Sequence, residues 1–258
     1  MTRTAARADQ PAARADTPAG KLAPLPSGDE KVRVVRAMFD TIAPRYDLVN
    51  RVMTFRLDVR WRRQALDALG LGPGALVLDV ATGTGDLCRD LIARGYGAIG
   101  VDLSLGMLRH ATTDAPLVQG DALCLPLPAA SVEGAVSGFA LRNFVDLGSF
   151  FDELGRVVRA GGRIALLDVA QPPNPVLRAG HAVYFGHVVP RIGGWLSDPA
   201  AYRYLPRSVA YLPEPAVVAG RLRTAGFGAV KRTLLSGGIT QLITATRVVT
   251  APTSGERR

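Results

Sequence analysis

The segment Asp79-Val-Ala-Thr-Gly-Thr-Gly-Asp86 is the part of the chain whose residue types and spacing point most directly to chemistry. Gly83 and Gly85 let the backbone turn sharply and approach a ligand closely. The segment follows a short apolar run, so its loop would lie at a strand end, where open α/β sheets bind ligands. A Gly-x-Gly pair alone is a weak signal, because several nucleotide-binding folds share it.

The same loop argues against a dinucleotide ligand. A dinucleotide fingerprint would have a third glycine at position 88, which is Cys88. Asp79 and Asp86 bracket the loop, and two carboxylates would repel a pyrophosphate but attract the ammonium and sulfonium of S-adenosylmethionine. We therefore predict S-adenosylmethionine as the cofactor, with a nucleotide-dependent oxidoreductase as the alternative enzyme class.

Acidic residues also follow the next two predicted strands. Asp102 ends the second strand, where its carboxylate could accept hydrogen bonds from both ribose hydroxyls of either cofactor. Asp121 and Ala122 follow the third strand, near the expected position of an adenine amino group, and Met107 lies where it could cover the adenine. Loop aspartates and a core methionine are the alternative interpretation. Acids at three successive strand ends favour a cofactor site.

The framework around these residues alternates between strand and helix patterns. Strands are predicted at 76–80, 98–101, 117–119, 132–139, 164–169, 229–235 and 239–247, and helices at 30–42, 58–69, 86–94, 104–111, about 147–160 and 215–225. Alternation of this kind predicts βαβ units and a mainly parallel sheet. Gly237-Gly238 between the last two strands predicts a hairpin and an antiparallel edge strand. We expect an α/β, Rossmann-like fold with a seven-stranded sheet and helices on both faces.

Length and composition favour one domain. The chain has 258 residues, of which 48% are hydrophobic, and this is enough to bury a single core. We expect a catalytic domain at 29–248, a substrate-capping insertion at 171–212, and disordered tails at 1–28 and 249–258. Two cysteines without metal-ligand spacing predict no metal site. No signal peptide or long apolar run is evident, so we expect a cytoplasmic or peripheral membrane protein.

The net charge of +9 is unevenly distributed. Residues 31–63 carry nine basic and three acidic side chains, and residues 171–232 carry eight and two. The stretch between them, 64–170, carries seven and twelve. Basic flanks suit a nucleic acid, an anionic membrane surface or an anionic substrate, or are simply a solvated surface. No nucleic-acid motif is recognisable, so a nucleic-acid-binding module is the less favoured alternative.

Four further motifs narrow the class. They are Phe39-Asp-Thr-Ile-Ala-Pro-Arg-Tyr-Asp-Leu-Val-Asn50, Phe139-Ala-Leu-Arg-Asn143, His187-Val-Val-Pro-Arg-Ile-Gly193 and Tyr202-Arg-Tyr-Leu205. With the strand-end residues, they make residues 31–247 resemble the quinone-biosynthesis C-methyltransferases, a family of class I S-adenosylmethionine-dependent methyltransferases. The resemblance implies methylation of a ring carbon of demethylmenaquinol, which the short link 103–116 favours, or of a ubiquinone precursor. Another small-molecule methyltransferase, acting for instance on a phenol oxygen, is the alternative.

The resemblance carries the family's cofactor contacts to Thr84, Asp102, Asp121 and Ala122. A family serine contact falls at Gly138, and the serine of this chain stands one position earlier, at Ser137. A shift of one residue along a strand turns the side chain to the other face. Gly138 is therefore the predicted contact by position, without the hydroxyl.

Carbon methylation requires an electron-rich ring, and a stabilised phenolate provides one. Arg142 could hold the phenolate and Asn143 the other ring oxygen, unless Arg142 merely pairs with Asp146. Tyr46 could close over the substrate, and His187 could accept a proton, unless it is a structural histidine. The implied polyprenyl tail predicts docking of the basic, aromatic flanks on an anionic membrane surface. Homo-oligomerisation is left open.

Overall fold

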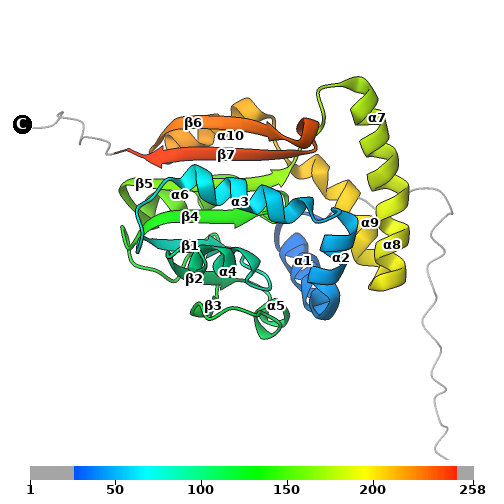
Figure 1. The fold of residues 1–258 in the computed structure, drawn as a ribbon, viewed down its shortest axis with the longest axis horizontal. Helices are drawn as coiled ribbons and strands as arrows, with labels where there is room; N and C mark the ends of the chain where they lie inside the picture. The colour runs from blue at the N-terminus through cyan, green and yellow to red at the C-terminus, as the bar shows by residue number, and fades with distance from the viewer. Residues whose placement is uncertain (1–25, 249–258) are drawn as a thin grey trace, which may run out of the picture.

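A seven-stranded sheet forms the centre of the molecule (Figure 1). The computed structural model describes residues 26–248, so the predicted tails lie outside the described residues except at 26–28. The strands run in the order β3-β2-β1-β4-β5-β7-β6, and β7 is antiparallel to both neighbours. Their bounds are β1 Leu76–Val80, β2 Gly97–Asp102, β3 Leu117–Gln119, β4 Val132–Gly138, β5 Val158–Val169, β6 Phe227–Leu235 and β7 Thr240–Arg247. The order reverses between β1 and β4, which predicts a ligand site beyond β1.

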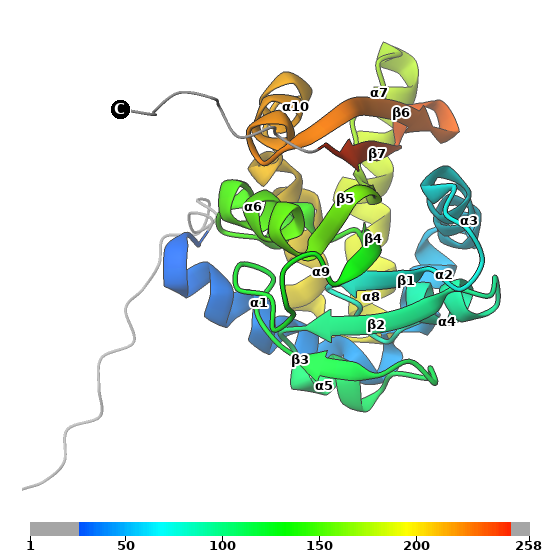
Figure 2. The ribbon, with the colours of Figure 1, turned by 90° about the vertical axis from the view of Figure 1, so that its left-hand side faces the viewer.

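Helices cover both faces of the sheet (Figure 2). Helices α3 and α4 pack on one face, and α6 and α10 pack on the other. The helices are α1 Gly28–Ile42, α2 Tyr46–Met53, α3 Leu57–Leu69, α4 Asp86–Ile92, α5 Leu105–Arg109, α6 Leu147–Val157, α7 Pro175–Val183, α8 Val189–Leu196, α9 Pro199–Ser208 and α10 Pro215–Thr224. The predicted fold class, with its parallel sheet and antiparallel edge, is confirmed.

The centre of the sheet is shielded from solvent because helices pack on both of its faces. Val77, Leu78 and Val80 of β1 are all at most 1% exposed. Strands buried on both faces are expected to be continuously apolar instead of alternating. The one charged residue of β1, Asp79, is also completely buried, so it needs a reason of its own.

Some local predictions differ from the structure. The helix predicted at about 147–160 ends earlier, at Val157, and Gly161-Gly162 beyond it lie inside β5. They form an irregularity opposite Glu133, whose carbonyl oxygen would lie 2.6 Å from a Cβ at position 162. Glycine therefore serves a close backbone approach here. Helix α2 was not anticipated. Phe55 and Arg56, both in left-handed conformation, separate it from α3.

A group of helices covers one end of the sheet (Figure 1). The predicted insertion at 171–212 consists of α7, a π-helical segment at Tyr184–Val188, α8, α9 and a 3₁₀ turn at Val209–Tyr211. Helix α8 packs on α2 and α9, and α9 also contacts α1. These contacts enclose a separate small core that includes Ile42, Val49, Met107, Val189 and Tyr202. In the described part of the chain, no helix is both long and apolar enough to cross a bilayer.

Candidate functional site

The glycine loop after β1 has the geometry that its sequence predicts. Gly83 and Gly85 have φ angles of 56° and 80°, in the left-handed region that favours glycine. A Cβ on Gly85 would lie 2.7 Å from the side chain of Thr113, so no larger residue fits. Between them, the Thr84 hydroxyl donates to Asp47 of α2 at 2.5 Å. This bond ties the loop to the helices above the sheet.

Asp79 lies beneath this loop and does not line either cavity described below. Its carboxylate accepts a hydrogen bond from the Thr82 hydroxyl at 2.6 Å, and its Oδ1 has no partner among the described residues. Burial raises the pKa of Asp79 to about 7. Its position favours support of the loop from below over the predicted direct contact with the cofactor.

Asp86, the second acid of the loop, is surrounded by arginines. Its carboxylate lies 3.1 Å from Arg62, 3.4 Å from Arg51, and is also paired with Arg89. The prediction that two free carboxylates repel a pyrophosphate therefore needs correction, because one is compensated and the other is buried with a raised pKa. The charge argument for the cofactor is weaker than the loop sequence suggested.

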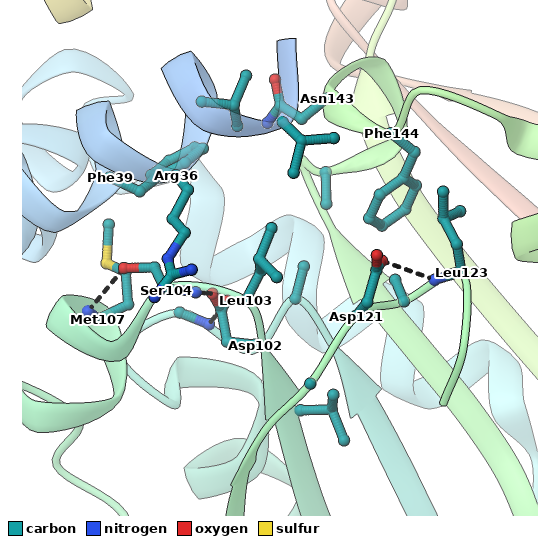
Figure 3. A pocket seen from close by; sticks show the side chains of 18 of the residues that line it. Arg36, Phe39, Asp102, Leu103, Ser104, Met107, Asp121, Leu123, Asn143 and Phe144 are labelled. Atoms are coloured by element: carbon teal, nitrogen blue, oxygen red, sulfur yellow. Dashed lines mark hydrogen bonds between the residues drawn. The ribbon is translucent and has the colours of Figure 1, made fainter. Parts of the chain in front are cut away.

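The smaller cavity, of about 110 Å³, lies at the ends of β1, β2 and β4 (Figure 3). Asp102 lines it, with Oδ2 accepting from the Gly83 N–H and Oδ1 from the Ser104 N–H, both at 2.8 Å. Each oxygen retains a lone pair for a ligand hydroxyl. Burial raises the pKa of Asp102, and the negative charge of Asp40 adds to the shift. Hence a bound diol would find a fixed acceptor here.

The predicted adenine contacts also line this cavity. Asp121 points into it while its Oδ1 accepts from the Leu123 N–H at 2.9 Å (Figure 3). Ala122 and Met107 are 7% and 1% exposed and belong to the same lining. Helix α1 covers the cavity with four side chains, those of Val32, Val35, Arg36 and Phe39.

A larger cavity of about 520 Å³ adjoins the first. Six residues line both cavities, namely Phe39, Tyr46, Ala81, Gly83, Gly138 and Phe139. Gly138 has no side chain to narrow this shared wall, whereas Ser137 is buried, lines neither cavity, and its hydroxyl has no hydrogen-bond partner among the described residues. The glycine at the expected serine position therefore contributes only backbone to the wall between the cavities.

Tyr46, at the start of α2, lies at the boundary between the cavities. Burial raises the pKa of its phenol, while the positive charge of Arg142 lowers it and the negative charge of Asp102 raises it. Tyr46 thus lies within electrostatic reach of one residue from each side. The sequence placed it over the substrate, and the structure places it at the junction with the cofactor cavity.

Arg142 lines the larger cavity from the 3₁₀ turn Leu141–Asn143 that follows β4. It pairs with the buried Asp168 at the end of β5, not with Asp146, which begins α6. Its Nη1 also donates to the Phe139 carbonyl at 2.7 Å, and its Nε donates to Ser208 at 3.1 Å. Among the described residues Nη2 has no hydrogen-bond partner, which leaves its two N–H groups for a ligand.

Asn143, predicted to bind the same substrate as Arg142, lines the smaller cavity instead (Figure 3). Its Oδ1 accepts a 3.4 Å hydrogen bond from the Tyr204 hydroxyl. Adjacent residues of a 3₁₀ turn point in different directions, so one turn can serve both cavities. The pair is brought to the site as predicted, but on two sides of it.

The histidines are placed differently from the prediction. His187 is exposed and absent from the lining of both cavities, because the π-helical segment turns it outward. His181, which no sequence motif had singled out, lines the larger cavity against Phe185, with ring centroids 4.4 Å apart. Burial lowers the pKa of His181 and favours the neutral imidazole. Its spacing of three from Tyr184, another lining residue, was the available signal.

Comparison with known proteins identifies the family to which this sequence and fold belong. The model of the ubiE/COQ5 methyltransferase family matches residues 26–247. The chain belongs to the ubiE/COQ5 methyltransferase family. This membership confirms the predicted resemblance and the predicted methyltransferase activity.

Relatives within this family match over most of their length. The ubiquinone/menaquinone biosynthesis C-methyltransferase UbiE of Syntrophotalea carbinolica is 41% identical, over 82% of this chain and 93% of its own. The demethylmenaquinone methyltransferase of Roseiflexus castenholzii is 42% identical, over 83% and 93%. The demethylmenaquinone methyltransferase of Thermus thermophilus is 41% identical, over 78% and 96%.

Solved structures outside these relatives share the fold. A phosphoethanolamine N-methyltransferase 2 of Haemonchus contortus, in complex with S-adenosyl-L-methionine, has a TM-score of 0.55 at 13% identity, covering 74% of this chain and 53% of its own. A SAM dependent methyltransferase of Aquifex aeolicus has a TM-score of 0.52 at 18% identity, covering 72% and 89%. The fold of the ubiE/COQ5 chain is thus that of class I methyltransferases.

The smaller cavity fits the cofactor of a ubiE/COQ5 methyltransferase, S-adenosylmethionine. Its glycine loop provides backbone at close range, Asp102 provides acceptors for a ribose, and Asp121 provides one for an adenine amino group. Apolar side chains such as Met107 and Phe39 enclose the remainder. The predicted cofactor is therefore confirmed for the family, while the role of each residue stays a prediction.

Proposed function

We propose that this ubiE/COQ5 methyltransferase methylates a ring carbon of a polyprenylated quinol, demethylmenaquinol, in quinone biosynthesis. The single observation that carries the proposal is the large apolar cavity that shares a wall with the cofactor cavity. A fused quinol ring and the first part of a polyprenyl chain need such a volume. The relatives from Syntrophotalea and Roseiflexus, a ubiquinone/menaquinone biosynthesis C-methyltransferase and a demethylmenaquinone methyltransferase, support the same activity.

Arg142 would supply the main electrostatic effect. When bound, S-adenosylmethionine supplies an electrophilic methyl group on its sulfonium. The quinol carbon becomes nucleophilic as its neighbouring hydroxyl loses a proton to solvent, and a guanidinium stabilises the resulting oxyanion, which regains a proton from solvent after methyl transfer. The pairing with Asp168 fixes the guanidinium, and Nη2 is the donor that remains. A positioned donor in a site shielded from water is worth more than one in solution.

Tyr46 and His181 would handle orientation and protons. Tyr46 stays protonated, because burial raises its pKa, so its hydroxyl can donate to a substrate oxygen beside the methyl donor. Methylation at carbon also releases the ring hydrogen as a proton. We assign His181 as its first acceptor in place of His187, since His181 lines the cavity and its neutral form is favoured.

Product analysis tests the activity. Purified protein with S-adenosylmethionine is offered short-tailed demethylmenaquinol, a demethylated ubiquinone precursor and simple phenols under reducing conditions. Mass spectrometry and proton NMR distinguish a ring C-methyl from an O-methyl group. We expect C-methylation of demethylmenaquinol at the highest kcat/KM. Methylation only at oxygen, or only of the non-quinol phenols, would overturn the proposal.

We further propose that the mouth of the large cavity docks on an anionic bilayer, where the polyprenyl tail resides. Phe55, Val176 and Leu177 line the cavity and yet are 74%, 78% and 50% exposed, so they form an apolar rim. Exposed basic residues near them in sequence, Arg56 and Arg178, suit anionic head groups. Arg62, which the charge pattern included, is instead buried among Asp58, Asp86 and Asp90.

Vesicle flotation tests this docking. The variant Phe55→Ser/Val176→Ser/Leu177→Ser should lose binding to phosphatidylglycerol-containing vesicles, because the apolar rim no longer inserts. Val217→Ser, an exposed apolar residue outside the cavity lining, is the matched control. Turnover should fall on a long-tailed quinol and persist on a short-tailed one. Equal losses on both substrates, or no vesicle binding by the unmodified protein at low salt, would refute docking.

A further inference from the structure

Lys31, near the start of α1, is a buried lysine that lies far in sequence from Arg142 and Asn143. It is only 3% exposed. Its ammonium donates to the carbonyl of Arg142 at 2.9 Å and to the carbonyl of Phe144 at 2.8 Å. Those two residues flank Asn143 in the chain. A single side chain therefore binds the backbone of the turn that presents Arg142 and Asn143.

A third segment joins this junction. The Lys31 Nζ lies 3.7 Å from the centroid of the Tyr211 ring, in the 3₁₀ turn Val209–Tyr211. The Tyr211 hydroxyl in turn donates to the Pro26 carbonyl, just ahead of α1. The start of α1, the turn after β4 and the end of the insertion thus meet around one ammonium. An ammonium over an aromatic face is favourable, and more so when water is excluded.

The junction is not a salt bridge. No carboxylate in the described part of the chain lies within 4 Å of the Lys31 ammonium. Burial lowers its pKa to about 8. An apolar side chain of similar size would bury at lower cost, so stability alone gives no reason for a lysine here. Its donors have a specific use, because they satisfy two backbone carbonyls beside the site.

Helix α1 is the cover of the cofactor cavity. Val32, Val35 and Phe39 line that cavity directly from one face of the helix. At its far end, Asp40 accepts from the Ser104 hydroxyl at 2.6 Å and from the Gly106 N–H at 2.8 Å. The cover is thus fastened to α5 at one end and, through Lys31, to the turn after β4 at the other.

We infer that Lys31 is a positioning residue that locks α1 over bound S-adenosylmethionine and, through the same bonds, holds the turn carrying Arg142 and Asn143 in place. The cofactor cover and the substrate-side guanidinium are then aligned together. Loss of the ammonium should weaken cofactor binding and lower turnover, although Lys31 lines neither cavity. The cofactor effect does not depend on which substrate is methylated, and only the turnover effect rests on the proposed quinol activity.

The inference has a pH signature. The charged and titratable groups at this junction include Glu30 on α1, Arg142 and Tyr211 on the two turns, and Tyr204 and Arg207 on α9. Burial raises the pKa of Tyr211, so its phenol does not ionise as the amine becomes neutral. Above a pH of about 8 the neutral amine loses its attraction to the ring and donates weaker hydrogen bonds.

Calorimetric titration with S-adenosylhomocysteine at pH 7 and pH 9 tests the inference. Lys31→Met preserves the side-chain volume and should bind about tenfold more weakly at pH 7, with little further loss at pH 9. The unmodified protein should bind several-fold more weakly at pH 9 than at pH 7. Lys231→Met removes an exposed lysine of β6 and is the matched control.

Thermal unfolding and turnover separate the possible results. If Lys31→Met only lowers the melting temperature and binds S-adenosylhomocysteine like the unmodified protein at both pH values, the lysine is structural and the inference is wrong. Tyr211→Leu, which removes the ring but keeps the lysine, provides a second variant if Lys31→Met does not fold, and it should weaken binding in the same direction. Failure of the quinol assay would reject the proposed substrate and leave the binding result to decide the role of Lys31.

Discussion

The two cavities of this methyltransferase are built from different parts of the chain. The cofactor cavity lies at strand ends, where Asp102 and Asp121 follow β2 and β3 and the backbone of the sheet fixes their positions. The larger cavity, which we propose binds the substrate, is enclosed mainly by helices outside the sheet, with α2, α7 and α8 contributing side chains. Strand ends thus form the cavity that fits the methyl donor, and helices outside the sheet form most of the cavity proposed for the substrate.

Their electrostatics differ as well. Asp102 is held by two backbone N–H groups, so its carboxylate is fixed before any ligand arrives. On the substrate side, the main charge is Arg142, and most of its donors are already used by Asp168, Phe139 and Ser208. The cofactor side therefore offers polar groups fixed by the backbone, whereas the proposed substrate side offers Arg142, Tyr46 and His181 within a mainly apolar wall. This contrast predicts that substitutions will separate cofactor affinity from turnover.

The largest effect is expected for Asp102→Ala. Charged hydrogen bonds contribute about 1.5–3 kcal/mol each, so losing two to the ribose should lower S-adenosylhomocysteine affinity by about a hundredfold or more. Calorimetric titration measures this loss, and circular dichroism checks that the fold persists. Asp114→Ala, an exposed acid in the link between β2 and β3, is the control. Unchanged affinity of the Asp102 variant would remove this residue from the cofactor site.

Arg142→Lys should affect the other cavity. Lysine retains the charge beside Asp168, but it lacks the planar fork that could hold Asp168 and a substrate oxygen together. We expect kcat to fall on the order of tenfold to a hundredfold, while S-adenosylhomocysteine affinity changes by no more than about twofold. Steady-state kinetics and calorimetry on the same preparation provide both numbers. A parallel loss of affinity would reassign Arg142 to the cofactor side.

The same division explains what could be predicted from sequence. Strand-end residues were predictable, because Gly83, Asp102 and Asp121 follow apolar runs whose parallel pairing leaves few positions for a ligand. His187 was selected from its motif, but it lies exposed in a π-helical segment, whereas His181 of the preceding helix lines the cavity. The partner of Arg142 was also missed, because Asp168 ends a strand that is adjacent in space and 26 residues away in sequence.

Gly193→Ala tests whether the substrate cavity can be damaged by itself. A Cβ at position 193 would lie 2.1 Å from the Tyr202 ring, which lines that cavity, so α8 and α9 must move apart. Such overpacking costs about 1–3 kcal/mol. Turnover should fall roughly tenfold with cofactor affinity unchanged. Gly186→Ala, with nothing within 4 Å of its added Cβ, should retain full turnover. A loss of cofactor affinity in the first variant would show that the cavities are coupled through this wall.

The smallest effect on turnover is expected for Asp79, the buried acid beneath the cofactor loop, whose substitution should change stability instead. Its pKa in the folded protein is about 7, above the ordinary value near 3.9. The folded protein therefore keeps a proton that the unfolded chain releases. The stability that this proton adds is fully present below about pH 4 and is lost as the pH rises through 7. Asparagine cannot titrate, yet its amide oxygen can still accept the Thr82 hydrogen bond.

Asp79→Asn should therefore gain stability relative to the unmodified protein as the pH rises from 4.5 to 8, on the order of 3 kcal/mol in the free energy of unfolding. Denaturant unfolding at pH 4.5, 6 and 8 measures the difference, with Asp114→Asn as an exposed control whose difference should stay constant. The gain arises because the unmodified carboxyl must either ionise in a dry site or hold its proton against the solvent pH. If the difference in the free energy of unfolding does not depend on pH, water or a bound cation must stabilise the ionised carboxylate. The space beneath the cofactor loop would then be accessible to solvent or ions.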